Sequence, residues 1–222
     1  LIRFMFSNLN IESSNVRIKD KMQTNYEEKK QEILKAAKKI FGQYGFDKTT
    51  LDDISRVVGI KKNSLYYYYP NKQALFSALI NEEAEQIFNT FNKIVESKKS
   101  ASNKLKDFIK VSGQHQRERA ALYTTTTKAF MEIQELIRTM HHDLLEKLAN
   151  LLQQILDEGI ENGEFKKHNS KELACYLLEM GVSIEQREYR ISHAEFLHEV
   201  DFDKIDKIVL TLVKYITEGI KK

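Results

Sequence analysis

Apolar residues recur at three- and four-residue spacings along most of this chain, and no long stretch alternates between apolar and polar positions. That period is typical of α-helices with one buried face, whereas half-buried strands need alternation. One proline and eight glycines among 222 residues also supply few turn residues for a β-sandwich or barrel. The pattern therefore predicts an all-α protein of about nine helices.

The first clear helical face starts near Tyr26, and Gly45 is placed to end that helix. Residues 1–25 are rich in Asn and Ser, which predicts a flexible N-terminal extension. Met22 lies just before the helical pattern, and we expect the biological chain to begin there, with the preceding residues as an upstream extension. An arm that enters a DNA minor groove is the less favoured interpretation of these residues.

Two short helices are predicted on either side of Gly59, over residues 51–58 and from 61 to about 68. Thr50 can cap the first helix, with Asp53 at the acidic position of a capping box. Pro70 ends the second, because the residue before a proline is disfavoured in helical geometry. Asn71 can then cap a long fourth helix.

The spacing of these two helices fits a helix-turn-helix. This motif needs apolar residues where the helices cross, a small residue at their closest approach and a turn that tolerates positive φ. A helical hairpin in an unrelated core is the alternative, but basic residues on the same segment favour DNA binding. The residues expected to face inward are Ile54, Ser55, Val58, Ile60, Leu65 and Tyr68.

The second short helix carries a polar outward face. Its residues are Lys61, Lys62, Asn63, Ser64, Tyr66 and Tyr67. In the major groove, lysine donates to guanine, asparagine pairs with adenine, and serine serves either base. Tyrosine hydroxyls and Lys72 suit phosphates, as do the amides that begin a helix at Asn71. A solvated helix face without a partner is the alternative for these side chains.

Charge is unevenly distributed. The whole chain has 35 Lys+Arg against 32 Asp+Glu, but residues 1–80 hold 14 basic and 8 acidic side chains. The N-terminal part is therefore suited to a polyanion. A single cysteine, Cys175, excludes an internal disulfide framework and is expected to be a core residue, and no apolar run is long enough to cross a bilayer. We expect a cytoplasmic protein without a membrane partner.

Residues 29 to about 80 resemble the TetR family of bacterial transcriptional regulators. The resemblance rests on the runs Thr49–Ile60 and Leu65–Phe76. Lys61 and Asn63 replace the family's common Ser and Gly, so the family's base preference is not carried over, and Asp52 stands where many members have a basic residue. The predicted DNA-binding set, most of it implied by the resemblance, is Thr50, Lys61, Lys62, Asn63, Ser64, Tyr66, Tyr67, Tyr68 and Lys72.

The resemblance implies a DNA-binding domain over residues 26–75 and a helical ligand-binding and dimerisation domain over residues 76–222. It implies a repressor that binds a pseudo-palindromic double-stranded operator as a homodimer, through its last two long helices, and is released by a small-molecule effector. A DNA-binding protein that is controlled by a protein partner without a ligand is the main alternative. A helical carrier or enzyme is the less favoured one.

The later helices are expected around Leu105, from Ala121 to Lys128, from Ile137 to Gly159 or Gly163, over 170–190 and over 203–219. Some of their polar and aromatic residues are predicted to line a ligand cavity, although they equally describe an ordinary core. These residues are Tyr123, Thr127, Phe130, Met131, His141, Tyr176 and Met180.

The sequence contains little that indicates a catalytic site or a metal site. His141 and His142 with Glu146 have a spacing that can bind a metal, but no second ligand pair is evident. No Ser/His/Asp order, glycine-rich phosphate loop or paired carboxylate motif is present in the sequence. We therefore expect no enzyme activity, no metal site and no cofactor.

Overall fold

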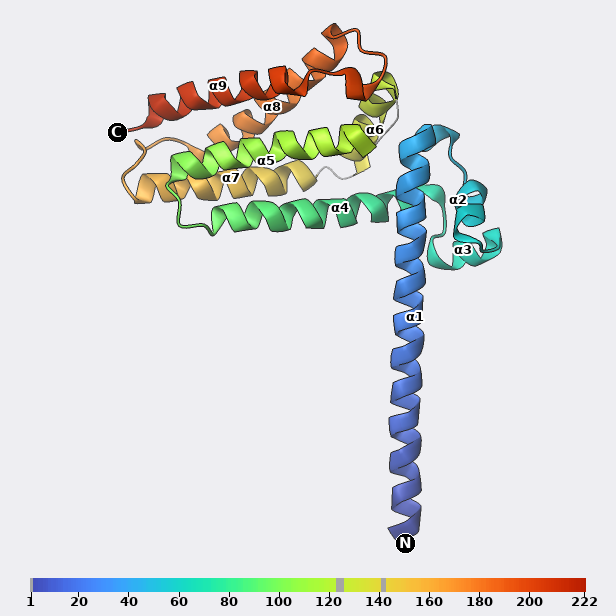
Figure 1. The fold of residues 1–222 in the computed structure, drawn as a ribbon. Coiled ribbons are helices and arrows are strands. Elements are labelled where there is room, and N and C mark those ends of the chain that lie inside the picture. Colours follow the sequence, from blue (N-terminus) through green and yellow to red (C-terminus); the bar gives the residue numbers. More distant parts are fainter. Residues whose placement is uncertain (1, 123–125, 141–142) are drawn as a thin grey trace. The chain divides into compact units, whose positions relative to one another are not determined.

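The computed structural model describes residues 2–122, 126–140 and 143–222. Over these residues there are nine α-helices and no β-strand, which confirms the all-α prediction (Figure 1). The helices are α1 (Ile2–Lys48), α2 (Leu51–Val58), α3 (Lys62–Tyr68), α4 (Lys72–Val95), α5 (Ala101–Leu122), α6 (Thr127–Met140), α7 (Asp143–Glu161), α8 (Ser170–Ile191) and α9 (Phe202–Ile220). A 3-10 turn, η1 (Leu197–Glu199), precedes α9.

The N-terminal segment differs from its prediction. Residues 2–25 were expected to be flexible, but they form the first part of α1. Residues 1–41 contain neither glycine nor proline, so no helix-breaking residue interrupts the backbone there. The predicted end at Gly45 is confirmed, because its φ of 79° and ψ of 167° break the helical path.

Two other helix boundaries were predicted wrongly. The helix expected over residues 121–128 is not a separate element among the described residues, where α5 reaches Leu122 and α6 starts at Thr127. The long helix expected from Ile137 corresponds to the end of α6, described to Met140, and to α7, described from Asp143. The apolar spacing is similar in both helices, so periodicity alone does not give the bounds of each helix.

The chain divides into two compact units. The first comprises residues 1–41 and 49–79, and the second comprises residues 42–48 and 80–222. In the first unit, the Phe41 and Phe76 rings meet edge to face at 5.4 Å. The other large buried apolar residues of this unit are Ile33, Leu34, Ile40, Leu51, Ile54, Leu65, Tyr69, Leu75 and Leu79. Four helices therefore share the small core that holds α3 in place.

In the second unit, α5 packs against α7 and α9 (Figure 1). Helix α8 packs against α7 and also contacts α9. Phe91 and Phe108 stack in its core with ring centroids 4.1 Å apart. The buried ammonium of Lys104 donates to both carboxylate oxygens of Glu158, at 2.8 and 2.6 Å, and to the carbonyl of Val95 at 2.6 Å. These bonds satisfy a charge that would be costly to bury alone.

The turn after α7 is closely packed. Gly159 lies in α7, and its carbonyl accepts a hydrogen bond from the Phe165 amide at 2.9 Å. A Cβ atom at position 159 would lie 2.2 Å from the fully buried Phe165 ring and 2.9 Å from the Ala101 Cβ. Glu164 accepts hydrogen bonds from the first amides of α5, at Ala101 (2.8 Å) and Ser102 (3.1 Å). Because Gly159 has no side chain, the Phe165 ring can pack directly against α7.

Candidate nucleic-acid interface

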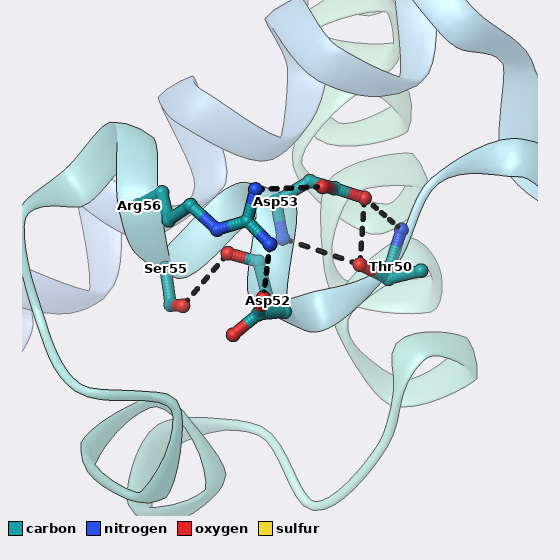
Figure 2. A network of polar contacts seen from close by, with 5 residues as sticks. All are labelled: Thr50, Asp52, Asp53, Ser55 and Arg56. Carbon is teal, nitrogen blue, oxygen red and sulfur yellow. Dashed lines mark hydrogen bonds and ion pairs between the residues drawn. The ribbon is translucent and has the colours of Figure 1, made fainter.

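The start of α2 has the predicted capping box (Figure 2). The Asp53 amide donates to the Thr50 hydroxyl oxygen at 3.2 Å, and the Thr50 amide donates to the Asp53 carboxylate at 3.0 Å. The Thr50 hydroxyl also donates to this carboxylate at 2.6 Å. These bonds from Thr50, the hydroxyl bond foremost, hold the pKa of Asp53 below its usual value of 3.8. The cap therefore depends on an ionised Asp53.

Arg56 is engaged within its own helix. Its guanidinium donates to the Asp52 carboxylate, and a second nitrogen lies 3.8 Å from the Asp53 carboxylate (Figure 2). The hydrogen bond to Asp52 is the main cause that raises the pKa of Arg56. Asp52 is therefore negatively charged at a position where a basic residue was considered for a phosphate contact. It also partly neutralises the positive charge of Arg56.

Gly59 makes the turn between the two short helices. Its φ of 73° and ψ of 28° are left-handed, a conformation that L-residues rarely adopt. Its amide donates to the carbonyl of Arg56 at 3.2 Å, and the Ile60 amide donates to the carbonyl of Ser55 at 3.0 Å. Ser55 is buried, as expected for the small residue at the helix crossing. The turn geometry of the predicted helix-turn-helix is confirmed.

Helix α3 has one buried and one exposed side. Leu65 is completely buried, whereas Lys61, Lys62, Asn63 and Ser64 are all exposed. Tyr66 and Tyr67 are exposed as well, with 44% and 74% of their surface accessible. Lys61 occupies the N-cap position, but its side chain makes no capping hydrogen bond. The polar side chains therefore lie together on one accessible face.

The inward position at the end of α3 was predicted wrongly. Tyr68 was expected to face the core, but Tyr69 is the buried residue and Tyr68 is half-buried. Tyr69 has left the helix, with φ −138° and ψ 113°, so its side-chain direction no longer follows the helical period. Val58 and Ile60, also expected to face inward, are half-buried.

The structure adds Tyr26 to this surface, a residue that the sequence marked only as a helix start. Its ring stacks on Tyr68 at 5.0 Å and meets Tyr67 edge to face at 5.7 Å. Tyr67 and Tyr68 also meet edge to face, at 5.3 Å. Tyr26 therefore restricts the orientation of two tyrosines that were predicted to contact DNA. No motif in the sequence signals this contact between α1 and α3.

Helix α4 begins beside α3 in the sequence, and its predicted cap is confirmed. The Asn71 side-chain oxygen accepts a hydrogen bond from the Ala74 amide at 2.7 Å. Lys72 is the first residue of α4 and is half-buried. Thr50, Lys72 and the residues of α3 all belong to the first unit, so the predicted DNA-binding set lies within one compact body.

The second unit contains a cavity of about 290 Å³. Residues from α4, α5, α6, α7, α8 and α9 line it. Most of the lining is aliphatic or aromatic, and the polar exceptions include Gln116, Arg119, Gln134 and Glu185. Such a mixture of apolar walls and a few polar groups is typical of small-molecule sites.

The five predicted cavity residues that the structure describes are not in the lining of this cavity. Thr127 is buried and donates to the carbonyl of Ala194 at 2.8 Å, and Phe130 is a core residue. Met131 and Met180 pack on the outside of the core, and Tyr176 is 57% exposed. These residues share a polar or aromatic character but lie on different helix faces, and composition does not specify the face. Tyr123 and His141 lie outside the described residues.

In the part of the chain that the structure describes, no helix is both long enough and apolar enough to cross a membrane. No group of three or more His, Cys, Asp or Glu side chains there is arranged to hold a metal ion. His141 and His142, which were considered as metal ligands, lie outside that part.

The fold and the exposed α3 face define a helix-turn-helix protein of the DNA-binding class. Residues 33–79 match the family model of bacterial regulatory proteins of the tetR family. The chain is 25% identical over 152 residues to the fatty acid metabolism regulator protein of Bacillus subtilis. That alignment covers 66% of this chain and 76% of the Bacillus protein. It is 45% identical over 62 residues to the biofilm operon icaADBC HTH-type negative transcriptional regulator IcaR of Staphylococcus epidermidis, covering 28% and 31% of the two chains.

A solved structure agrees with these matches. The crystal structure of a transcriptional regulator from Cytophaga hutchinsonii has a TM-score of 0.67 and 28% identity, and the match covers 86% of this chain and 97% of that chain. The match to the tetR family of bacterial regulatory proteins thus lies in the DNA-binding segment, residues 33–79, and the chain as a whole is similar to transcriptional regulators. It is a DNA-binding regulator of transcription and not an enzyme.

Proposed function

We propose that the protein represses transcription by binding a pseudo-palindromic operator as a homodimer, and that a small molecule in the second unit releases it. The exposed face of α3, opposite the buried Leu65, is the observation that carries the DNA-binding part. One such face reaches one half-site, and two-fold symmetry doubles the contacts. The name of IcaR, a negative regulator, supports repression rather than activation.

The outer faces of α8 and α9 support the dimer. Both helices have large apolar or aromatic side chains at their surface: Tyr176 (57% exposed) and Ile191 (44%) on α8, Leu212 (38%) and Tyr215 (64%) on α9. Part of the apolar stripe expected on α9 serves the chain's own core, since Ile205 and Val209 are buried. A second copy of the same two helices would cover the remaining apolar surface.

Helix α4 supports the link between ligand and DNA. Leu75, Phe76 and Leu79 belong to the core of the first unit, whereas Ile87 and Phe91 line the cavity of the second. A ligand that favours one packing of α4 in the second unit acts on a helix that continues into the DNA-binding unit. Couplings of about 1–3 kcal/mol, which change affinity roughly five- to 150-fold, are typical of such systems.

The test is fluorescence anisotropy on a labelled duplex that carries the DNA preceding the protein's own gene, with a scrambled duplex for comparison. Lys62→Ala should weaken binding to the specific duplex by about tenfold, the effect of one lost base contact. Lys72→Ala should weaken both duplexes alike and reduce the salt dependence by about one unit of slope per site.

Lys98→Ala is the matched control, because Lys98 is an exposed lysine in the loop between α4 and α5. It should bind both duplexes like the unmodified protein, and sedimentation should show the same oligomeric state for all variants. Undiminished DNA binding by the Lys62→Ala/Lys72→Ala double variant would refute the assigned surface.

A further inference from the structure

We infer that the cavity binds a small amphipathic anion, whose negative head lies at Arg119 and whose apolar body lies between the helices. This inference rests on the proposed function and deepens it by assigning a chemical class to the effector. Four properties of the cavity lead to it: its volume, its walls, its unpaired buried polar atoms and the balance of its charges.

The volume limits the size of the ligand. The cavity of about 290 Å³ lies at the lower end of the range of roughly 300–1,000 Å³ that small-molecule sites span, so a small ligand fits it. The walls exclude a ligand that is polar throughout. Phe91 and Phe108 are almost fully buried, and Leu148 and Leu177 add aliphatic surface from α7 and α8. A chain of about eight carbons, or a ring of similar size, matches both the volume and the walls.

The polar residues of the cavity leave two buried atoms without a hydrogen-bond partner. These are Nε of Arg119 and Oε1 of Gln116, and neither has a partner among the described residues. Both belong to α5, one turn apart. A buried donor without an acceptor is unfavourable, especially on a charged group. An acceptor on the ligand would pair with the guanidinium and remove this penalty.

Arg119 is also held in position. Its guanidinium carbon lies 5.3 Å from the centroid of the Phe130 ring. No carboxylate lies within ion-pair distance of Arg119 in the part of the chain that the structure describes. By contrast, Arg138, which also lines the cavity, donates to both carboxylate oxygens of Glu135 at 2.8 and 2.6 Å. Arg119 is therefore a positive group in the cavity lining that lacks a close counter-ion.

Glu185 is the nearest candidate for that counter-ion, but burial opposes its charge. It accepts a hydrogen bond from Gln116 at 2.9 Å. Burial raises the pKa of Glu185 to about 7, with Arg119 and Gln116 acting in the opposite direction and Asp206 adding to the increase. Near neutral pH the carboxyl is thus about half protonated and compensates Arg119 only in part.

The other charged or titratable groups near Glu185 belong to α4, α5, α6, α8 and α9, whereas α7 contributes only leucines to the cavity lining. Asp206 on α9 is paired with Arg117, and Tyr189 lies one turn beyond Glu185 on α8. The remaining groups are His115 on α5, Glu83 on α4 and the Glu135–Arg138 pair on α6. An anion beside Arg119 would favour the protonated form of Glu185, so its binding would be coupled to proton uptake.

The experiment is isothermal titration calorimetry of the full-length chain with three probes of equal length: octanoate, 1-octanol and octylammonium. Octanoate should bind at least tenfold more tightly than the other two. Its affinity should fall several-fold from about pH 6 to about pH 8, where octanoate itself stays ionised because carboxylic acids titrate near about pH 4. Equal affinity for the three probes, or tighter binding of octylammonium, would overturn the inference.

Three variants at two residues identify the groups. Arg119→Gln should remove the preference for octanoate over octanol, whereas Arg119→Lys should keep part of it. Glu185→Gln should still bind octanoate but lose the pH dependence. Arg190→Gln is the control, since Arg190 is an exposed arginine on α8. An octanoate preference that survives Arg119→Gln in a folded protein would contradict the assignment.

The DNA experiment is independent of this one. Loss of the octanoate preference leaves the proposed repressor without an assigned effector class but still able to bind DNA. Failure to bind DNA, with the preference intact, would refute the proposed function and leave an anion-binding helical protein.

Discussion

Replacing Gly159 with alanine should destabilise the second unit, although alanine is the better helix former. The helix-propensity gain is about 1 kcal/mol. Against it, the new Cβ would lie 2.2 Å from the Phe165 ring, well inside ordinary van der Waals contact. Phe165 is fully buried and its amide donates a hydrogen bond to the Gly159 carbonyl, so the ring cannot easily move away from the new Cβ atom. Overpacking of this kind costs about 1–3 kcal/mol and occasionally more.

The expected net loss is therefore up to about 2 kcal/mol, or a decrease of up to roughly 8 °C in melting temperature for a chain of this size. Gly181→Ala is the matched control, because a Cβ at this helical position in α8 would meet no atom within 4 Å. It should stabilise the protein by up to about 1 kcal/mol. Urea unfolding followed by circular dichroism, at one protein concentration, measures both variants. A Gly159→Ala protein at least as stable as the Gly181→Ala protein would refute the packing argument.

Two further predictions concern the dimer and the cap of α2. Leu212→Arg should shift the protein toward monomers in sedimentation velocity and weaken operator binding. Lys214→Arg, at an exposed position of the same helix, should do neither. A fully dimeric Leu212→Arg protein would exclude the outer face of α9 as the dimer interface. Asp53 has a lowered pKa in the folded state, so its contribution to stability is present above its usual pKa of 3.8 and is lost as the pH falls from there through the lower pKa of the folded state. Asp53→Asn should therefore reduce the acid sensitivity of the DNA-binding unit in thermal melts, and an unchanged pH profile would contradict the role of the ionised cap.

Local sequence determined the features that depend on residues close together in the chain. Thr50 with Asp53, Gly59 and Asn71 each act within a few residues, through a cap or a left-handed turn. The helix-turn-helix and the exposed face of α3 were therefore predictable, because caps, turns and a 3.6-residue period are properties of a short segment. The predicted starts of α2 and α4 are confirmed by the caps at Thr50 and Asn71.

Tertiary structure decided what depends on residues far apart. The contact of Tyr26 with Tyr67 and Tyr68 and the cavity with Arg119 and Glu185 both require the packing of different helices. A list of aromatic and polar residues does not show which face each helix turns inward. The five predicted cavity residues that the structure describes lie in the core, against it or at the surface. Local geometry follows from the nearby chain, whereas a binding cavity forms only where distant helices meet, and the sequence does not state which faces meet.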